Sequence, residues 1–227
     1  MNASTSSAVL HRVGDDPRAS GLTLLEAGLI FTRRGSPRRL VALVSVFAVA
    51  RIVVGGLSAW DLLLVAAFVG LQPMTEWVVH TGILHWRPRK LGPLRIDTLL
   101  SSAHRAHHER PHDEAHWFIP FRSGFVGVVF AMVAGWILLP TMGLWLSMLF
   151  IVHAIALSYE WTHFLCHSSY RPQGRVYKRI WRFHRLHHFK NEHYWMGVTM
   201  HMGDLILGTR PDPKAVETSP TCRKLYG

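Results

Sequence analysis

Four long apolar runs constrain what this chain can fold into more than any other feature. They cover residues 40–57, 62 to about 80, 124–139 and 144–158. A helix that crosses a bilayer needs about 20 predominantly apolar residues, and the shorter runs reach this length when their polar ends are included. Short loops, "GLSAWD" and "PTMG", divide the runs into pairs. The sequence therefore predicts an all-α integral membrane fold with four transmembrane helices in two hairpins.

The positive charge of the chain lies almost entirely outside these runs. There are 25 lysines and arginines and a formal net charge of +11 at pH 7, which by itself suggests a nucleic-acid partner. All of these residues except Arg51 precede the first run, lie in 85–122 or follow 167. The positive-inside rule places these segments, and with them both termini, in the cytoplasm. We exclude nucleic acid, because binding it needs basic residues interleaved with stacking aromatics on a soluble surface.

The N-terminal segment differs in composition from the rest of the chain. Residues 1–35 are predicted to be a tail that is disordered over its first 20 residues, with a short helix at 22–31 lying on the membrane surface. Residues 36–227 are predicted to form the membrane domain. No basic-then-apolar signal peptide opens the chain. Cys166 and Cys222 both fall on the predicted cytoplasmic side, so we expect reduced thiols.

Histidines follow the second and the fourth run in the same order. After the second run come "EWVVHTGILHW" and then "HRAHH"; after the fourth come "EWTHFLCH" and then "HRLHH". Each half therefore consists of a hairpin, a Glu-Trp pair, two spaced histidines and a His-Arg-x-His-His cluster. This internal repeat indicates two similar structural units, which suits a pair of metal ions.

The spacing of these histidines is that of metal ligands on helices. Positions three and four apart share a helix face, so each cluster, and the pair His163 and His167, presents its imidazoles together. Neutral imidazole is a common ligand of iron, zinc and copper. Ten such nitrogens exceed the four ligands of a structural zinc site, which favours a dinuclear catalytic site with about five nitrogens per metal. The predicted ligands are His80, His85, His104, His107, His108, His163, His167, His184, His187 and His188.

Two further features of the repeat bear on this site. His80 and His85 are five residues apart and would diverge on a regular helix, so we predict a π-bulge or an unwound turn there, with a kink at Pro73 one turn earlier. Ligating histidines usually donate their second N–H to a carboxylate or a carbonyl. Glu76 and Glu160, which are placed alike in the two halves, are predicted to accept these hydrogen bonds.

Several side chains near the clusters are candidates for contacting a substrate. They are Trp117, Tyr194, Trp195, Arg105 and Arg185, together with His153 inside the fourth run. Anchoring at the membrane interface explains the aromatic residues nearly as well, and lipid phosphates explain the arginines. A hydrogen-bonded core histidine is the simpler interpretation of His153, although ionisable residues inside a membrane are often functional.

The ordered set HxxxxH, HxxHH, HxxxH and HxxHH resembles the motif of the fatty acid hydroxylase and sterol desaturase superfamily, from residue 76 to about 209. The segment "YWMGVTMHMGDLILGT" is similar to the one that follows the last cluster in fatty acid 2-hydroxylases, and the short chain resembles their bacterial members. The motif identifies the superfamily but not the substrate. It does not include His112, His116, His193 and His201, so these four are predicted not to bind metal.

The resemblance implies a cytosolic helical cap that holds a di-metal site, with two iron ions and O2 as cofactors and zinc as a substitute in purified forms. The expected reaction is hydroxylation of an unactivated C–H bond of a lipid from the bilayer, most favourably a fatty acyl chain, and desaturation stays open. Residues 1–35 are too short for a fused cytochrome b5 domain. Electrons are therefore expected from a separate ferredoxin or cytochrome b5-like donor with its reductase.

Two other kinds of function stay open at this point. Carotenoid ring hydroxylases and sterol oxidases or desaturases share related histidine sets. The non-enzymatic alternative is a membrane metal-binding or transport protein. A transporter places its ligands near the membrane midplane, whereas these histidines gather at the cytoplasmic ends of the predicted spans, which counts against transport.

Overall fold

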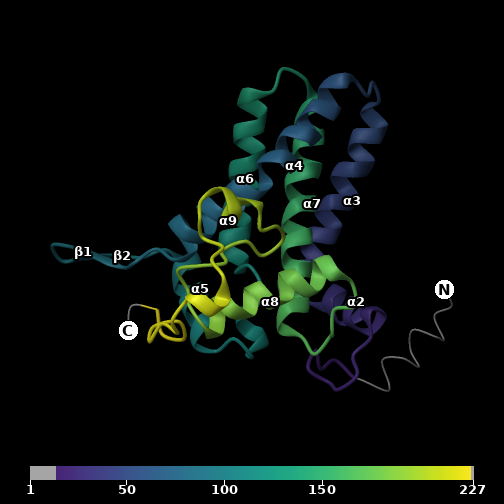
Figure 1. Cartoon of the computed structure of the whole chain (residues 1–227). Helices are drawn as coiled ribbons and strands as arrows, with labels where there is room; N and C mark the ends of the chain where they lie inside the picture. Colours follow the sequence, from purple (N-terminus) through teal and green to yellow (C-terminus); the bar gives the residue numbers. More distant parts are fainter. Residues whose placement is uncertain (1–13, 226–227) are drawn as a thin grey trace.

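Four long helices form the upright part of the molecule (Figure 1). The computed structural model describes residues 14–225. The long helices are α3 (Gly35–Val54), α4 (Ala59–Val79), α6 (Phe121–Leu138) and α7 (Met142–His167). α7 packs against each of the other three. The pairs α3–α4 and α6–α7 are the two helical hairpins that the apolar runs predict.

Three helical stretches are long and apolar enough to cross a membrane: Ala59–Leu84, Glu114–Leu138 and Met142–His167. α3 is 20 residues long and carries Arg38, Arg39 and Arg51, and it is not among these stretches. The described part of the chain therefore contains three long apolar helices, and the fourth span stays a prediction.

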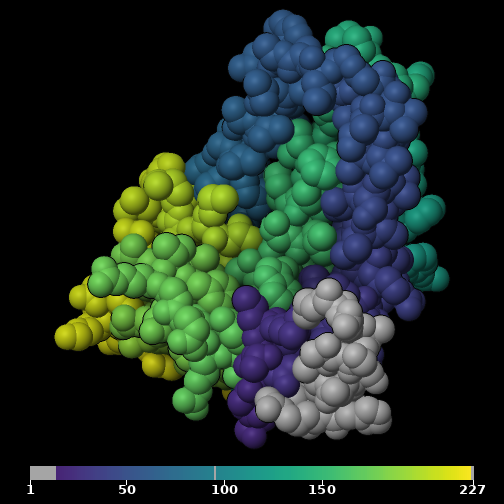
Figure 2. Space-filling model, turned by 90° about the vertical axis from the view of Figure 1, so that its right-hand side faces the viewer, coloured from purple at the N-terminus to yellow at the C-terminus, as the bar shows by residue number. Residues whose placement is uncertain are grey.

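Shorter elements gather into a base at one end of the bundle. They are α2 (Leu24–Arg33), α5 (Leu99–Glu109) and α8 (Arg175–Phe189), with α9 (Met202–Ile206) beside α4 and 3₁₀ turns at Glu114–His116 and Pro213–Ala215. In Figure 2, α8 and the C-terminal segments (green and yellow) form a broad mass at the lower left, with α4 above it and α3 at the right. An antiparallel ribbon of β1 (Arg89–Leu91) and β2 (Leu94–Ile96) projects sideways, a departure from the all-α prediction (Figure 1).

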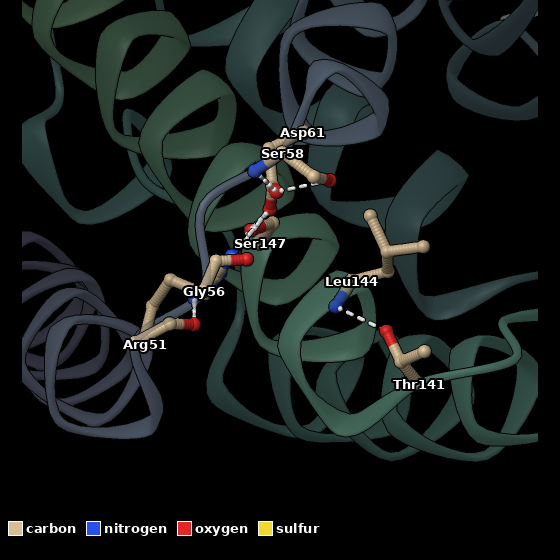
Figure 3. A network of polar contacts seen from close by, with 8 residues as sticks. Arg51, Gly56, Ser58, Asp61, Thr141, Leu144 and Ser147 are labelled. Carbon is tan, nitrogen blue, oxygen red and sulfur yellow. Dashed lines mark hydrogen bonds and ion pairs between the residues drawn. The ribbon is translucent and has the colours of Figure 1, made fainter.

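A buried polar network closes the end of the bundle farthest from the base (Figure 3). The Arg51 side chain is almost fully buried, and its guanidinium donates to the Asp61 carboxylate of α4 (3.0 Å) and to the Ser147 hydroxyl of α7 (2.8 Å). It also donates to the carbonyl of Gly55, which with Gly56 forms a turn at φ angles of 66° and 64° that favour glycine. The arginine that interrupts the first apolar run therefore ties α3, α4 and α7 together.

The predicted N-terminal helix docks on the protein. The helix expected at 22–31 is present as α2, and Ala27, Ile30 and Phe31 are buried in a core at the foot of α7. The Phe31 ring lies 5.4 Å from the Phe164 ring, centroid to centroid. The apolar face of α2 thus packs on protein, where the sequence suggested a membrane surface. The tail that was predicted to be disordered lies mostly outside the described residues.

Candidate metal centre

The ten predicted histidines converge into two groups of five at the foot of the long helices. The first group is His80, His85, His104, His108 and His187, and the second is His107, His163, His167, His184 and His188. One ring nitrogen per residue lies within 4.8 Å of every other in its group. All ten side chains are buried, so the groups form an enclosed centre between the bundle and the base.

The two halves of the chain exchange one ligand each. Each group takes the spaced histidine pair and the first and last histidine of the cluster from its own half. The middle histidine of each cluster crosses over: His107 joins the second group, and His187 joins the first. The internal repeat is thus a structural near-symmetry, and it assigns each histidine to one site.

A π-helical turn brings His80 and His85 to the same site. The segment His80–Leu84 is a π-helix at the end of α4, and the His85 amide donates to the His80 carbonyl five residues earlier (2.9 Å). Residues five apart lie above one another in this geometry, and the two rings lie 5.0 Å apart, centroid to centroid. The predicted helix distortion is therefore confirmed, and its purpose is ligand placement.

Backbone carbonyls orient the histidine rings. Hydrogen bonds join His80 Nδ1 to Met196 O (2.5 Å), His108 Nδ1 to Cys222 O (2.9 Å), His163 Nδ1 to Trp117 O (2.8 Å) and His187 Nδ1 to Tyr194 O (2.9 Å). A carbonyl only accepts, so each Nδ1 carries the proton and each Nε2 is left with a lone pair. This is the arrangement by which proteins fix the tautomer of a metal-binding histidine.

The ring nitrogens meet as the ligands of a cation do. Within the groups, neighbouring Nε2 atoms lie 2.8–3.2 Å apart. His108 and His187 both use Nδ1–H on a carbonyl, so their lone pairs face each other at 3.2 Å with no proton to share. Metal–nitrogen distances of about 2.0–2.1 Å put adjacent ligands at right angles about 3 Å apart. The residues therefore fit two metal ions, and imidazole suits iron, zinc and copper alike.

The ligands of α5 and α8 are held neutral. Burial lowers the pKa of His108 to about 3, against which its hydrogen bond to Cys222 acts only partly. Burial, with the neighbouring histidines as the next cause, also holds the pKa of His104 and His184 well below the usual range. Neutral imidazoles bind a metal ion without first losing a proton, so the site is ready for metal at neutral pH.

Glu76 and Glu160 act on the backbone and do not contact the histidines. Glu76 accepts from the amides of Val198 and Thr199 and from the Thr199 hydroxyl. Glu160 accepts from the Ile119 amide (2.8 Å) and the Ser36 hydroxyl (2.7 Å). In place of the predicted hydrogen bonds from histidine, the two carboxylates accept hydrogen bonds from the loops and from Ser36 of α3.

The two glutamates occupy equivalent places in these loops. Val198 follows Met196, whose carbonyl holds His80, by two residues. Ile119 follows Trp117, whose carbonyl holds His163, by two residues as well. In both halves, then, a buried carboxylate fixes the loop that orients a ligand on its own helix.

The sequence missed the residues that shape the loop at 194–209. Asp204 is fully buried and accepts from the amides of Met196 and Gly197, both at 2.8 Å. Burial alone would raise the pKa of Asp204, but the nearby His201 ring and hydrogen bonds from the Thr209 hydroxyl and the two amides hold it below the ordinary value. The buried Trp195 adopts φ 57°, a left-handed conformation that is rare for a large side chain, between the two carbonyls that hold His187 and His80.

A largely apolar cavity of about 420 Å³ extends from the histidines into the bundle. His80, His104, His107 and His163 line its end at the foot of the bundle, and side chains of α4, α6 and α7 line most of the rest. Of the predicted substrate contacts, Trp117 and His153 lie on its wall. The cavity therefore connects the candidate metal centre to the membrane-crossing part of the bundle.

The other four predicted substrate contacts lie away from this cavity. Trp195 is fully buried and stacks on Phe183, and Tyr194 contributes its carbonyl to His187. Arg105 donates to Asp97 and to the Trp86 carbonyl, and Arg185 lies over the Trp181 and Phe189 rings. These contacts place the four side chains in the base and outside the lining of the cavity, and a role for them toward the substrate stays a prediction.

The predicted non-ligands stay outside both groups. His112, His116, His193 and His201 belong to neither set of five. His112 stacks on Phe189, and His201 lies 3.5 Å from Asp204. Cys166 and Cys222 are free and buried, as expected for reduced thiols.

The fold and the site together define a membrane-helix protein with a buried, histidine-rich centre for two metals. The family model described as fatty acid hydroxylase matches residues 65–209, and the chain belongs to this family. Among solved structures it resembles the hydroxylase domain of full-length Scs7p at 20% identity and a TM-score of 0.65, over 81% of this chain and 68% of that one. At this identity the likeness shows the fold alone. No curated protein matches the chain by sequence.

Proposed function

We propose that the protein is a di-iron, O2-dependent membrane hydroxylase that oxidises an unactivated C–H bond of a lipid, most favourably a fatty acyl chain. One observation carries this proposal: the apolar cavity has metal-ligand histidines as its end wall and membrane-crossing helices as its sides. An acyl chain in that cavity would place one carbon beside the metals. Family membership supports the same reaction class.

The two groups of five histidines would hold two iron ions. Iron, O2 and electrons together supply the oxidising power for a C–H bond, which zinc cannot, because zinc has no redox chemistry. The chain's own residues fix the ligand geometry through the carbonyls of Trp117 and Met196, and the apolar lining excludes water and aligns the chain.

The substrate would enter from the bilayer. α4 and α6 both pack on α7, and side chains from all three line the cavity. On α6 the wall includes Gly124 and Gly127, and a Cβ atom at Gly127 would have no atom within 4 Å. The absence of a side chain there is not required by packing, so we interpret it as room for the lipid.

Electrons would arrive at the outer face of α8. Its exposed cations are Arg175, Lys178, Arg179, Arg182 and Arg185, while its buried face carries His184, His187 and His188. An acidic ferredoxin or cytochrome b5-like donor fits this cationic face, only about one helix diameter (10–12 Å) from the metals. By the positive-inside rule, this face and both termini would lie in the cytoplasm.

The alternatives are less well supported. A carotenoid ring or a sterol would also be apolar enough for the cavity, and desaturation begins at the same C–H bond. Transport is disfavoured because both histidine groups lie at the foot of the long helices, with no second set along a path in the described part of the chain.

The test is lipid analysis of a host that expresses the chain with a matched electron donor. We expect a hydroxylated acyl species that is absent with Gly127→Leu, which narrows the cavity, while the bound iron is unchanged. Val176→Leu, at an exposed position on α8, is the matched control and should keep the product. Hydroxylated carotenoid or oxidised sterol alone would replace the acyl proposal. A fully iron-loaded protein that oxidises no lipid with any donor would refute the enzymatic one.

A further inference from the structure

The cavity contains a polar side chain that the protein itself does not satisfy. His153 of α7 lines the cavity, is 3% exposed and packs against the Phe47 ring, 5.0 Å between centroids. Its Nδ1 lies 2.6 Å from the Leu149 carbonyl, one turn earlier on the helix. Because the carbonyl only accepts, Nδ1 carries the proton, and Nε2 of the neutral ring is an acceptor.

Nε2 of His153 has no hydrogen-bond partner in residues 14–225. The ring nitrogens of His188 also lack a partner, but they are fully buried atoms, and Nε2 of His153 is not among the atoms buried in that way. We conclude that Nε2 faces the cavity. A buried acceptor without a partner costs about 1–3 kcal/mol, so a ligand that donates a hydrogen bond at this point gains over one that does not.

This acceptor lies at the end of the cavity away from the metals. His153 precedes His163 by ten residues on α7, which at 1.5 Å per residue is about 15 Å. Gln72 lines the cavity from α4, eight residues before His80, or about 12 Å. The Gln72 amide makes only a 3.5 Å approach to Glu76. Two helices therefore each place one polar side chain at a similar depth in a largely apolar space.

We propose that His153 and Gln72 form a subsite for a hydroxyl group, so that the preferred substrate is a lipid whose deeply inserted end carries one. The hydroxyl would donate to His153 Nε2 and accept from the Gln72 amide. A methyl-terminated chain would leave His153 Nε2 without a partner and the Gln72 amide with only its 3.5 Å hydrogen bond to Glu76. This inference rests on the proposed function, since it assumes that a lipid occupies the cavity. The substrate class is an acyl lipid with a hydroxyl about 15 Å from the oxidised carbon.

The charge of the lining supports a neutral group over a charged one. No lysine or arginine lines the cavity in the described part of the chain, and Glu76 is the one acidic residue on its wall there. A carboxylate at the deep end would therefore be buried without a cation, at a cost of several kcal/mol. A hydroxyl carries no such penalty and matches one acceptor and one donor.

Binding without turnover tests the subsite. The full-length, metal-loaded protein in nanodiscs, without O2 or an electron donor, is titrated with palmitic acid and with its ω-hydroxy derivative. One neutral hydrogen bond contributes about 0.5–1.5 kcal/mol, so the hydroxylated lipid should bind about two- to tenfold more tightly. A series of ω-hydroxy acids of different length should show one optimum, set by the distance from the metals to His153.

Variants separate the subsite from general damage to the cavity. His153→Leu should abolish the preference while palmitic acid binds within about twofold of the wild-type affinity, and Gln at this position should restore part of the preference, because it supplies an acceptor. Ile155→Leu, an apolar exchange on the same wall, should keep the preference. Equal affinities in the wild type, or an unchanged preference in His153→Leu, would overturn the inference. If neither lipid binds in this titration and no lipid is oxidised in the expressing host, the proposed function fails instead.

Discussion

Replacing Glu76 with glutamine should weaken the first histidine group and spare the second. The Glu76 carboxylate accepts from the amides of Val198 and Thr199 and fixes the loop whose Met196 carbonyl holds His80. A hydrogen bond to a charged group contributes about 1.5–3 kcal/mol and a neutral one about 0.5–1.5, so two weakened amide bonds cost roughly 2 kcal/mol. Transmitted to His80, this is about thirtyfold in metal affinity, within the tenfold to hundredfold range for residues that support a ligand.

The assay exploits the near-symmetry of the two halves. Metal-free protein is titrated with ferrous iron under argon, and the affinities of the two binding steps are measured. Glu160→Gln, which disturbs the loop holding His163, is the matched variant and should weaken the other group. Mössbauer spectra of the half-loaded proteins should then show two different iron environments. If both variants weaken both steps equally, or neither step changes, the proposed role of the carboxylates is wrong.

Three further outcomes are expected. Removing the metals with a chelator should lower the thermal midpoint of unfolding, because imidazoles without a metal face one another at about 3 Å. Zinc should restore the midpoint but not hydroxylation. An unchanged midpoint would contradict the fit of the site to metal. Arg51→Met should lower the free energy of unfolding, measured by chemical denaturation, by about 3–5 kcal/mol, because it leaves the Asp61 carboxylate buried without its cation. Arg51→Met with Asp61→Asn should recover part of this loss. Equal losses in the single and double variants would argue against a stabilising Arg51–Asp61 ion pair. Arg179→Glu with Arg182→Glu should raise the KM for a protein electron donor but leave turnover with a small chemical reductant unchanged. Lys214→Glu, at an exposed position in the 3₁₀ turn Pro213–Ala215, should change neither. A normal KM in the double variant would exclude docking on α8.

The sequence predicted the parts of the site that depend on local spacing. Ligand intervals of three and four follow from helix geometry, and the interval of five between His80 and His85 required the π-turn that the structure contains. Local spacing carries no information on how two distant helices dock. The exchange of His107 and His187 between the groups was therefore not predictable from the order of the motifs.

The remaining errors have similar physical causes. Backbone carbonyls hold the ligand rings, and a carbonyl leaves no mark in the sequence, so Glu76 and Glu160 were assigned the right neighbourhood but the wrong contacts. The apolar face of α2 can be covered by lipid or by protein, and its pattern is the same in both cases. The ribbon of β1 and β2 was overlooked although Gly92, at φ 59°, marks its turn.

The exchanged histidines have a consequence for how such a protein can originate. One half alone offers only four ligands to the site that it builds, and its middle histidine points to the site of the other half. Two copies of a half-length ancestor, related by a two-fold axis, would complete both sites at once, since each copy would lend the other its fifth ligand. Fusion of the two genes would then preserve the axis while freeing each copy to diverge. The present chain fits this history: its histidine order is still duplicated, whereas the glutamate that supports each site now sits four residues from the ligand in one half and three in the other.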